Sequence, residues 1–262
     1  MMINITIPVY NEEAQLVDSV RRVAAFLALH QPGPVEIVIA DNASTDQTLR
    51  LASKLAEEHP QVRVVHLDQK GRGRALRRVW MESTAAILSY MDVDLSTDLA
   101  FFPALIEPLI AGRSDLSVGS RLRKESQTRR GLKREFLSRG YNWLVKAALH
   151  TRFSDAQCGF KPKAITRRAA LDLLPQVEDE AWFFDTELLA LAEWRGYRLF
   201  NLPVRWTDDP DSRVRICRTA WEDIKGLIHL RRRFARERKG ALVIPARPGS
   251  PRQTSNGRLP VE

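Results

Sequence analysis

Cysteine is scarce in this sequence of 262 residues, and long apolar runs are absent. The two cysteines, Cys158 and Cys217, are too few for a disulfide framework and lack the C-x-x-C spacing of a metal site, so we expect a reducing environment. No stretch of about 18 apolar residues occurs, which argues against a spanning helix in this sequence. The first residues also lack the pattern of a signal peptide, which predicts a cytoplasmic protein, free or lying on a membrane.

Basic residues outnumber acidic ones by 41 to 32, which gives a formal net charge of +9. Nucleic acid, anionic lipid and nucleotides are all compatible with this charge. The basic residues cluster at 121–139 and 213–239. Aromatic side chains do not interleave with them as base-stacking surfaces would, so we expect no nucleic-acid partner.

The first hundred residues alternate between two kinds of pattern. Short apolar or β-branched runs at 3–9, 35–40, 62–67 and 86–91 predict strands. The segments between them have helical spacing, and Ser44 or Thr45 is the expected cap of the second helix. Strands separated by helices predict an α/β fold with a mostly parallel sheet and helices on both faces.

Beyond residue 98 the pattern loosens. It predicts helices at 101–111, 136–149, 183–194 and 219–238, and strands at 116–119 and 197–204. From residue 240 the chain is rich in Pro, Gly, Ser and Arg, which predicts disorder. We therefore divide the chain into an α/β domain (1–215), a basic amphipathic helix (216–239) and a disordered tail (240–262).

The strongest local pattern is the pair Asp92 and Asp94, which directly follows the apolar run at 86–91. Residues i and i+2 of an extended chain point to the same side, and open α/β sheets bind ligands at the carboxyl ends of their strands. Two carboxylates there suit a divalent cation that also binds substrate phosphates. The alternative is two solvated acids in a loop, and the buried strand before them favours the metal site.

Two more segments carry polar groups at expected strand ends. Asp41 follows the second strand, where a carboxylate can accept hydrogen bonds from a ribose or a base, although the stretch 44–46 is also a helix cap. The run 70–74, Lys-Gly-Arg-Gly-Arg, combines glycines that allow close approach to phosphate with positive charge. A tight turn with solvated arginines is the alternative, and the Walker pattern is absent.

Together these segments resemble the family 2 glycosyltransferases, which have the Rossmann-like GT-A fold. The resemblance covers roughly residues 3–235. Within the family the chain is most similar to polyprenyl- (dolichyl-) phosphate glucosyl- and mannosyltransferases. The segments that carry the resemblance are 7–13 (Ile-Pro-Val-Tyr-Asn-Glu-Glu), 38–46, 71–75, 91–94, 119–121 (Gly-Ser-Arg), 155–161 (Asp-Ala-Gln-Cys-Gly-Phe-Lys), 182–188 and 202–206.

The resemblance implies a hexosyltransferase that moves a sugar, with inversion, from a nucleoside diphosphate to polyprenyl phosphate. It implies a role for each of several residues: Pro8, Tyr10, Glu12 and Asp41 line the nucleoside pocket, Arg72 and Asp92 bind the nucleotide sugar, and Asp92 and Asp94 bind Mg²⁺ or Mn²⁺. Two departures stand out. Arg72 replaces the usual lysine of the glycine loop, although the two are not equivalent donors. After Asp94 comes Leu-Ser-Thr, which offers no strong further metal ligand.

The candidate catalytic residues are Asp94, Arg121, Asp155 and Asp185. An acceptor phosphate monoester is mostly dianionic at neutral pH, so it needs cations more than a strong base. The resemblance assigns Arg121 to the acceptor phosphate. Asp155 is a candidate for orienting or deprotonating the acceptor, or else a turn residue. Asp185 opens a helix, where an acid is expected in any case.

Several alternatives stay open at this stage. UDP-glucose is the expected donor, because 182–188 resembles the glucosyl branch, and GDP-mannose is the second. A soluble or cell-wall acceptor, or a nucleotidyltransferase reaction, would use the same acid pair. The basic helix at 219–238 predicts docking on an anionic membrane, at the inner face of the plasma membrane, or else packing on the domain with its arginines in water.

Overall fold

The structure, a computed structural model, describes residues 1–30, 33–129, 132–156, 163–207 and 216–239. The expected tail at 240–262 and the segment 157–161 of the family resemblance lie outside these residues. The side chains of 129, 132–134, 207, 216–220 and 239 are also outside the description.

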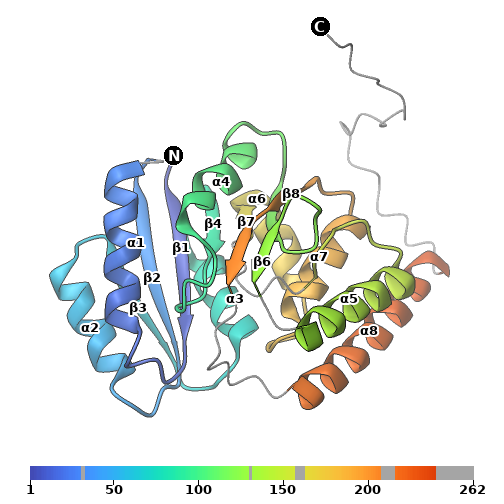
Figure 1. The fold of residues 1–262 in the computed structure, drawn as a ribbon, viewed down its shortest axis with the longest axis horizontal. Helices are drawn as coiled ribbons and strands as arrows, with labels where there is room; N and C mark the ends of the chain where they lie inside the picture. The colour runs from blue at the N-terminus through green and yellow to red at the C-terminus, as the bar shows by residue number, and fades with distance from the viewer. Residues whose placement is uncertain (31–32, 130–131, 157–162, 208–215, 240–262) are drawn as a thin grey trace, which may run out of the picture.

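The N-terminal half alternates strands and helices as the sequence predicts, and its four strands run parallel to one another (Figure 1). In chain order its elements are β1 (Ile3–Val9), α1 (Leu16–His30), β2 (Val35–Asn42), α2 (Thr48–Glu58), β3 (Val62–Leu67), α3 (Arg72–Glu82) and β4 (Ile87–Tyr90). The strands start near the N-terminus at the top of Figure 1, so their carboxyl ends gather at the bottom.

The C-terminal half contains mostly short strands together with the two longest helices, α5 and α8. Its elements are η1 (Leu99–Phe101), α4 (Phe102–Ile110), β5 (Leu116–Ser120), β6 (Gln127–Arg129), α5 (Leu132–Leu149), β7 (Lys163–Thr166), α6 (Arg167–Leu173), η2 (Leu174–Gln176), α7 (Phe184–Trp194), β8 (Leu199–Pro203), β9 (Arg205–Thr207) and α8 (Ile216–Lys239). The sequence did not predict β6, β7, β9 or α6, which have three, four, three and seven residues. Runs this short carry too little periodicity to be recognised.

The main sheet has seven strands in the order β3-β2-β1-β4-β7-β5-β8. Within it β7 is antiparallel to both neighbours, while the other pairings are parallel. Strands β6 and β9 form a separate parallel pair. The prediction of a mostly parallel α/β sheet is therefore confirmed, with β7 as the reversed strand.

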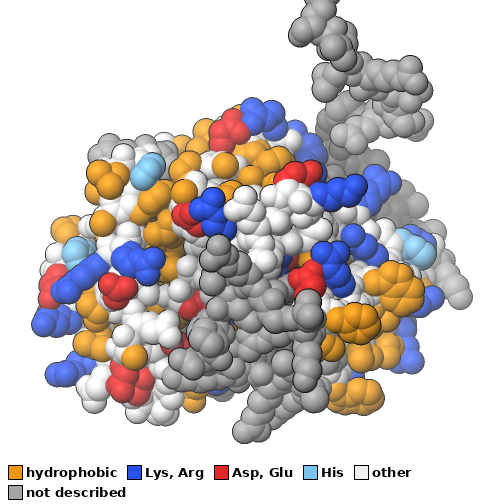
Figure 2. Space-filling view, in the orientation of Figure 1, with side chains coloured by type: hydrophobic (Ala, Val, Ile, Leu, Met, Phe, Trp, Pro, Cys, Tyr) orange, Lys and Arg blue, Asp and Glu red, His pale blue; other side chains and the backbone are white. Residues whose placement is uncertain are grey.

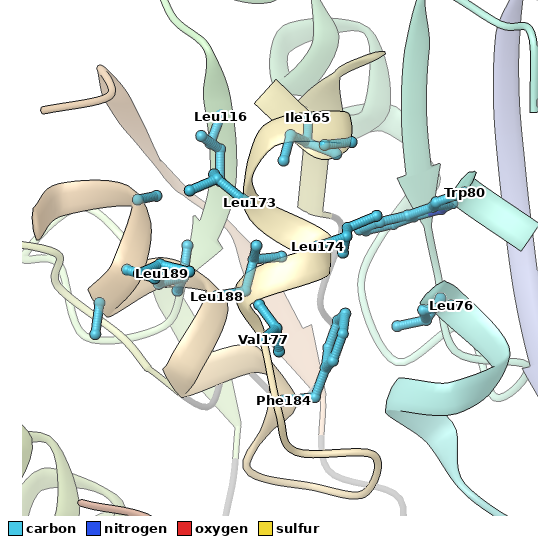
Figure 3. Packing of buried hydrophobic residues seen from close by; sticks show 14 of the residues in the cluster. Leu76, Trp80, Leu116, Ile165, Leu173, Leu174, Val177, Phe184, Leu188 and Leu189 are labelled. Carbon is cyan, nitrogen blue, oxygen red and sulfur yellow. The ribbon is translucent and has the colours of Figure 1, made fainter. Parts of the chain in front are cut away.

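Each face of the sheet packs against its own set of helices. Ile3, Ile5 and Ile7 of β1 point toward the cluster that includes buried residues of α1, α2 and α4. The opposite face packs against α3, α6 and α7, where Trp80, Leu173 and Leu188 meet (Figure 3). Successive residues of a strand point to opposite faces of the sheet, so helices cover both faces. The ends of the strands remain to form a site.

The predicted cap of α2 is wrong. The helix begins at Thr48, and its first residue is preceded by Gln47, whose side chain makes no capping hydrogen bond. Ser44 instead accepts a hydrogen bond from the backbone N–H of Asn11 at 3.0 Å. Asp46 Oδ1 accepts the N–H of Thr48 at 2.9 Å, so Asp46 provides the hydrogen bond to the first residue of the helix. Ser44 is used to join two loops, which the sequence pattern alone does not reveal.

Helix α8 packs on the domain, with Leu227, Leu230 and Phe234 buried. The ring of Phe234 stacks on Trp194 of α7 at 4.5 Å between centroids. The indole N–H of Trp194 donates to Glu237 Oε2 at 2.9 Å. Part of the predicted apolar side of this helix is therefore used in packing, and the division of the chain at residue 216 stays a prediction.

A second set of large apolar side chains on α5 and α8 remains exposed. We name it the α5–α8 face, and it consists of Phe136, Leu137, Trp143, Leu144, Trp221, Ile224 and Ile228. Figure 2 shows hydrophobic side chains interspersed with Lys and Arg at the lower right, where α5 and α8 lie in Figure 1. Among the described residues, no helix is both long and apolar enough to cross a membrane.

Candidate active site

Three loops at the carboxyl ends of β1, β2 and β4 share an unusual backbone conformation. Asn11, Ala43 and Leu95 have φ angles of 53°, 59° and 47°. Side chains other than glycine rarely adopt this left-handed region, and residues held there cluster at functional sites. These loops carry the segments 7–13, 38–46 and 91–94 of the family resemblance, whereas the run 70–74 follows β3.

Hydrogen bonds join the loops after β1 and β2. Asn11 Oδ1 accepts the N–H of Thr45 at 2.8 Å, and Glu13 Oε2 accepts the N–H of Gln47 at 2.8 Å. The N–H of Glu12 donates to Thr48 Oγ1 at 2.8 Å. These contacts hold the expected nucleoside residues of β1 and β2 beside one another.

Asp41 is completely buried at the end of β2, between β1 and β3. Its Oδ2 accepts a hydrogen bond from His66 Nδ1 at 2.7 Å and a weaker one from the N–H of Ser44 at 3.4 Å. Its Oδ1 is also buried and has no hydrogen-bond partner among the described residues. A buried carboxylate oxygen without a partner is unfavourable, so this atom is suited to accept a donor from a ligand.

Pro8 and Tyr10 flank Val9, the residue that pairs with Asp41 in the sheet. Pro8 pairs with Ala40 in the sheet, one residue before Asp41. The ammonium of Lys70 lies 3.2 Å from the centre of the Tyr10 ring, a cation–π contact, and burial lowers the pKa of Lys70. The structure thus brings Pro8, Tyr10, Glu12 and Asp41 to one end of the sheet, as the resemblance implies.

Arg72, at the start of α3, occupies the centre of the site. Its Nη2 lies 3.0 Å from Asp185 Oδ2, and its Nε lies 4.0 Å from Asp92 Oδ1. The guanidinium also donates to the hydroxyl of Tyr90 and lies 5.1 Å from the ring centre of Trp182. Burial opposes the charge of Arg72, but the nearby acids, Asp185 first, raise its pKa, so it stays a cation.

Asp185 also contacts a second buried cation, Lys163, whose Nζ lies 2.8 Å from Oδ1. The Tyr90 hydroxyl donates to the same carboxylate at 3.0 Å. Burial is the main reason that the pKa of Tyr90 is well above its ordinary value, so the phenol keeps its proton. The sequence had identified Asp185 but missed Tyr90 and Lys163, which are ordinary strand residues until the fold brings them to a charged partner.

The acid pair lies in the segment that follows β4, and a hydrogen bond ties this segment to α1. The hydroxyl of Ser19 donates to the carbonyl of Val93, and Asp94 Oδ1 accepts the N–H of Ser96 at 2.9 Å. Among the described residues, no group of three or more Asp, Glu, His or Cys could hold a metal ion. Two carboxylates fit a hard cation only if substrate phosphates and water complete its ligand shell, as they do for Mg²⁺ in phosphate-binding sites.

Arg121 and Asp155 form a buried ion pair. Asp155 Oδ2 accepts from Arg121 Nε at 3.0 Å and from its backbone N–H at 3.2 Å, and Asn142 Nδ2 lies 3.4 Å from Oδ1. The guanidinium also lies 5.2 Å from the ring centre of Trp206. An antiparallel bridge between Trp206 and Thr97 connects this pair to the segment that follows Asp94.

A mostly parallel α/β sheet with polar groups at its strand ends defines a Rossmann-like architecture. A family model described as Glycosyl transferase family 2 matches residues 4–174, and the chain belongs to this family. The chain is 35% identical to glycosyltransferase AglD of Haloferax volcanii over 227 residues, which cover 86% of this chain and 35% of AglD. It is 31% identical over 230 residues to the dolichyl-phosphate beta-glucosyltransferase of Mus musculus, covering 81% and 69% of the two chains.

The chain therefore spans about a third of AglD, and it spans 65% of a dolichyl-phosphate beta-glucosyltransferase of Trichomonas vaginalis, ALG5C, to which it is 29% identical. Among solved structures it is similar to glucosyl-3-phosphoglycerate synthase of Mycobacterium tuberculosis in complex with Mn²⁺, UDP and phosphoglyceric acid. The TM-score is 0.67 at 20% identity, covering 88% of this chain and 78% of that one. The mannosyltransferase PcManGT of Pyrobaculum calidifontis, in complex with GDP-Man and Mn²⁺, has a TM-score of 0.54 at 22% identity, with 80% and 57% covered. The likeness confirms the expected GT-A fold.

Proposed function

We propose that this chain transfers a hexose from a nucleoside-diphosphate sugar to polyprenyl phosphate with inversion, and that glucose is the favoured hexose. The observation that carries the proposal is the arrangement at the strand ends: buried Asp41 at one side, Arg72 in the centre, and Asp92 within 4.0 Å of Arg72. The names of the dolichyl-phosphate relatives support the acceptor and the sugar.

Asp92 and Asp94 would hold Mg²⁺ or Mn²⁺, a choice supported by the Mn²⁺ in the two similar solved structures. A bound cation supplies charge neutralisation for the departing diphosphate. Arg72 adds a permanent positive charge beside Asp92, and Asp185 fixes its position. In this role Asp185 positions the guanidinium of Arg72. Its contacts with three donors fit this role better than proton abstraction.

Arg121 would bind the acceptor phosphate, with Asp155 holding the guanidinium in place. Because a phosphate monoester is mostly dianionic at neutral pH, it attacks without needing a strong base. The ion pair favours orientation over deprotonation as the role of Asp155. Elsewhere in the basic segment, Arg123 pairs with Glu125 and Arg139 with Glu135.

The proposed donor is UDP-glucose, with GDP-mannose second. The relatives named beta-glucosyltransferases support glucose, and a similar solved structure contains UDP. A transfer assay with both donors and a short polyprenyl phosphate, with and without EDTA, tests the proposal. We expect butanol-soluble labelled product from UDP-glucose, and none with EDTA.

Other results of the same assay would contradict it. A product that stays in water would indicate a soluble acceptor. Release of glucose 1-phosphate from UDP-glucose would indicate nucleotidyl transfer, because that reaction moves the nucleotide and leaves the sugar phosphate behind. Transfer that continues in EDTA would remove the proposed role of the cation.

The α5–α8 face is the surface that we propose to dock on an anionic membrane, at the inner face of the plasma membrane. Exposed aromatic rings beside arginines are typical of interfacial helices. Each basic residue near anionic lipid contributes about 1 kcal/mol. Arg231 and Arg232 are exposed, whereas Arg233 pairs with Glu237 and lies near two further acids.

Flotation with anionic vesicles tests this docking. The double variant Arg231→Glu/Arg232→Glu should lose most of the bound fraction. The matched control is Arg21→Glu/Arg22→Glu, which reverses two exposed arginines of α1. Equal flotation of both variants and the unchanged protein would contradict the proposal.

A further inference from the structure

The two oxygens of Asp41 are not equivalent. Oδ2 is engaged by His66 and by the N–H of Ser44, whereas Oδ1 is buried with no partner among the described residues. The whole side chain is inaccessible to solvent in this structure. A nucleobase that displaces the side chains covering Asp41 therefore finds one acceptor oxygen rather than two.

His66 is the residue that creates this asymmetry. It lies at the end of β3, directly opposite Asp41 in the parallel register. The 2.7 Å contact requires a proton on Nδ1, because an ionised carboxylate only accepts hydrogen bonds. The other ring nitrogen lies 3.7 Å from a carboxylate oxygen of Asp68, so the imidazole is held between two acids. His66 therefore acts as a fixed donor to Asp41.

Nucleobases differ in what they present to a carboxylate. Uracil has one ring N–H, flanked by two carbonyl groups that only accept. Guanine presents a ring N–H and an exocyclic amino group side by side, a pair that matches both oxygens of a free carboxylate. A single available oxygen satisfies the uracil donor and leaves one guanine donor unpaired.

We propose that His66 is a specificity-determining residue that makes the Asp41 pocket prefer uracil over guanine. This inference rests on the proposed nucleotide-sugar function of the site. A donor buried without a partner costs about 1–3 kcal/mol, so UDP should bind about 5- to 150-fold more tightly than GDP. A site built this way rejects a base by leaving a polar group unpaired.

Calorimetry of the full chain with UDP and with GDP, each in the presence of Mn²⁺, tests the proposal. The unchanged protein should prefer UDP by at least about fivefold. His66→Ala removes the shorter of the two hydrogen bonds to Oδ2, so the preference should shrink at least fivefold, mainly through tighter binding of GDP. His66→Gln keeps an N–H donor at this position and should retain the preference. The matched control is His30→Ala, which removes a histidine at the end of α1 whose ring stacks on Phe26.

The outcomes are distinguishable. If neither nucleotide binds, the proposed function fails, and the inference fails with it. If UDP binds but the unchanged protein prefers GDP, or His66→Ala keeps the full preference, the function stands and the role of His66 is wrong. If His66→Gln relaxes the preference as much as His66→Ala does, the size of the imidazole is responsible, which also overturns the proposal.

Discussion

Several buried charged side chains contact one another at the centre of this site. Asp185 is buried and contacts two buried cations, Arg72 and Lys163, together with a phenol that donates to it. Removing one member of such a group leaves an uncompensated charge away from water, which is costly. The carboxylate therefore has a structural role that precedes any role in transfer.

Substitution of Asp185 tests this electrostatic balance. We expect Asp185→Asn to lower the free energy of unfolding by about 3–5 kcal/mol, because Arg72 and Lys163 lose their common partner. Urea denaturation followed by circular dichroism measures it. Adding Lys163→Met to this variant removes one stranded charge and should recover part of the loss. A double variant less stable than Asp185→Asn alone would contradict the account.

The sequence predicts part of the site at this scale. Asp41 and Asp92 were found because each directly follows an apolar run, so a strand end could be inferred before the fold was known. His66 and Lys163 were missed, since their importance comes from partners 25 and 22 residues away in the chain. Such partners come together only through the strand order, which sequence periodicity does not give.

Whole elements are held together by a second buried acid, Glu187 of α7. Its carboxylate accepts the N–H groups of Glu178 and Asp179 at 3.1 and 2.8 Å, which fastens the preceding loop to the helix. Arg233 of α8 lies 3.7 Å away. Burial is the main cause that raises the pKa of Glu187 above its ordinary value of 4.5, although the two N–H groups lower it.

This raised pKa predicts a pH dependence of stability. A carboxyl group that binds its proton more tightly in the folded state stabilises the fold below pH 4.5, and that stabilisation is lost as pH rises through the folded pKa. Glu187→Gln keeps an acceptor oxygen but cannot ionise. The variant should therefore gain stability relative to the unchanged protein between about pH 4 and pH 7. Chemical denaturation across this range measures the difference, and a constant difference would contradict the assignment.

At the same scale, long elements were predicted well and short ones were not. Helices α4 and α7 and strands β1 and β3 lie within one residue of their expected bounds. Strand β7 and helix α6 were missed because four and seven residues hold too little pattern. The start of helix α2 was misassigned because Ser44 accepts a hydrogen bond from another loop rather than from its own helix.

At the scale of the whole molecule, the α5–α8 face is a group of large apolar side chains that packing leaves exposed. Phe136 and Trp143 are 80% and 70% exposed. If this face enters a membrane interface, burying each ring contributes about 1.5–3 kcal/mol at most. Phe136→Ala/Trp143→Ala should therefore weaken binding to anionic vesicles at least about tenfold, as measured by sedimentation with vesicles.

The control for that experiment is Leu29→Ala, on α1 away from α5 and α8 in Figure 1. Leu29 is 82% exposed, so it matches the two aromatic residues in exposure. Vesicle binding of this variant should stay unchanged. If it weakens as much as the double variant does, the attachment is not specific to the α5–α8 face.

The central claim is that the acid pair after β4 holds the cation that neutralises the departing nucleotide. The most direct test is the transfer rate from UDP-glucose to polyprenyl phosphate for Asp94→Asn, beside Asp18→Asn on the surface of α1 as a control. We predict that Asp94→Asn lowers the rate at least about 100-fold with an unchanged melting temperature, while Asp18→Asn keeps it. A rate for Asp94→Asn equal to that of the control would contradict the account.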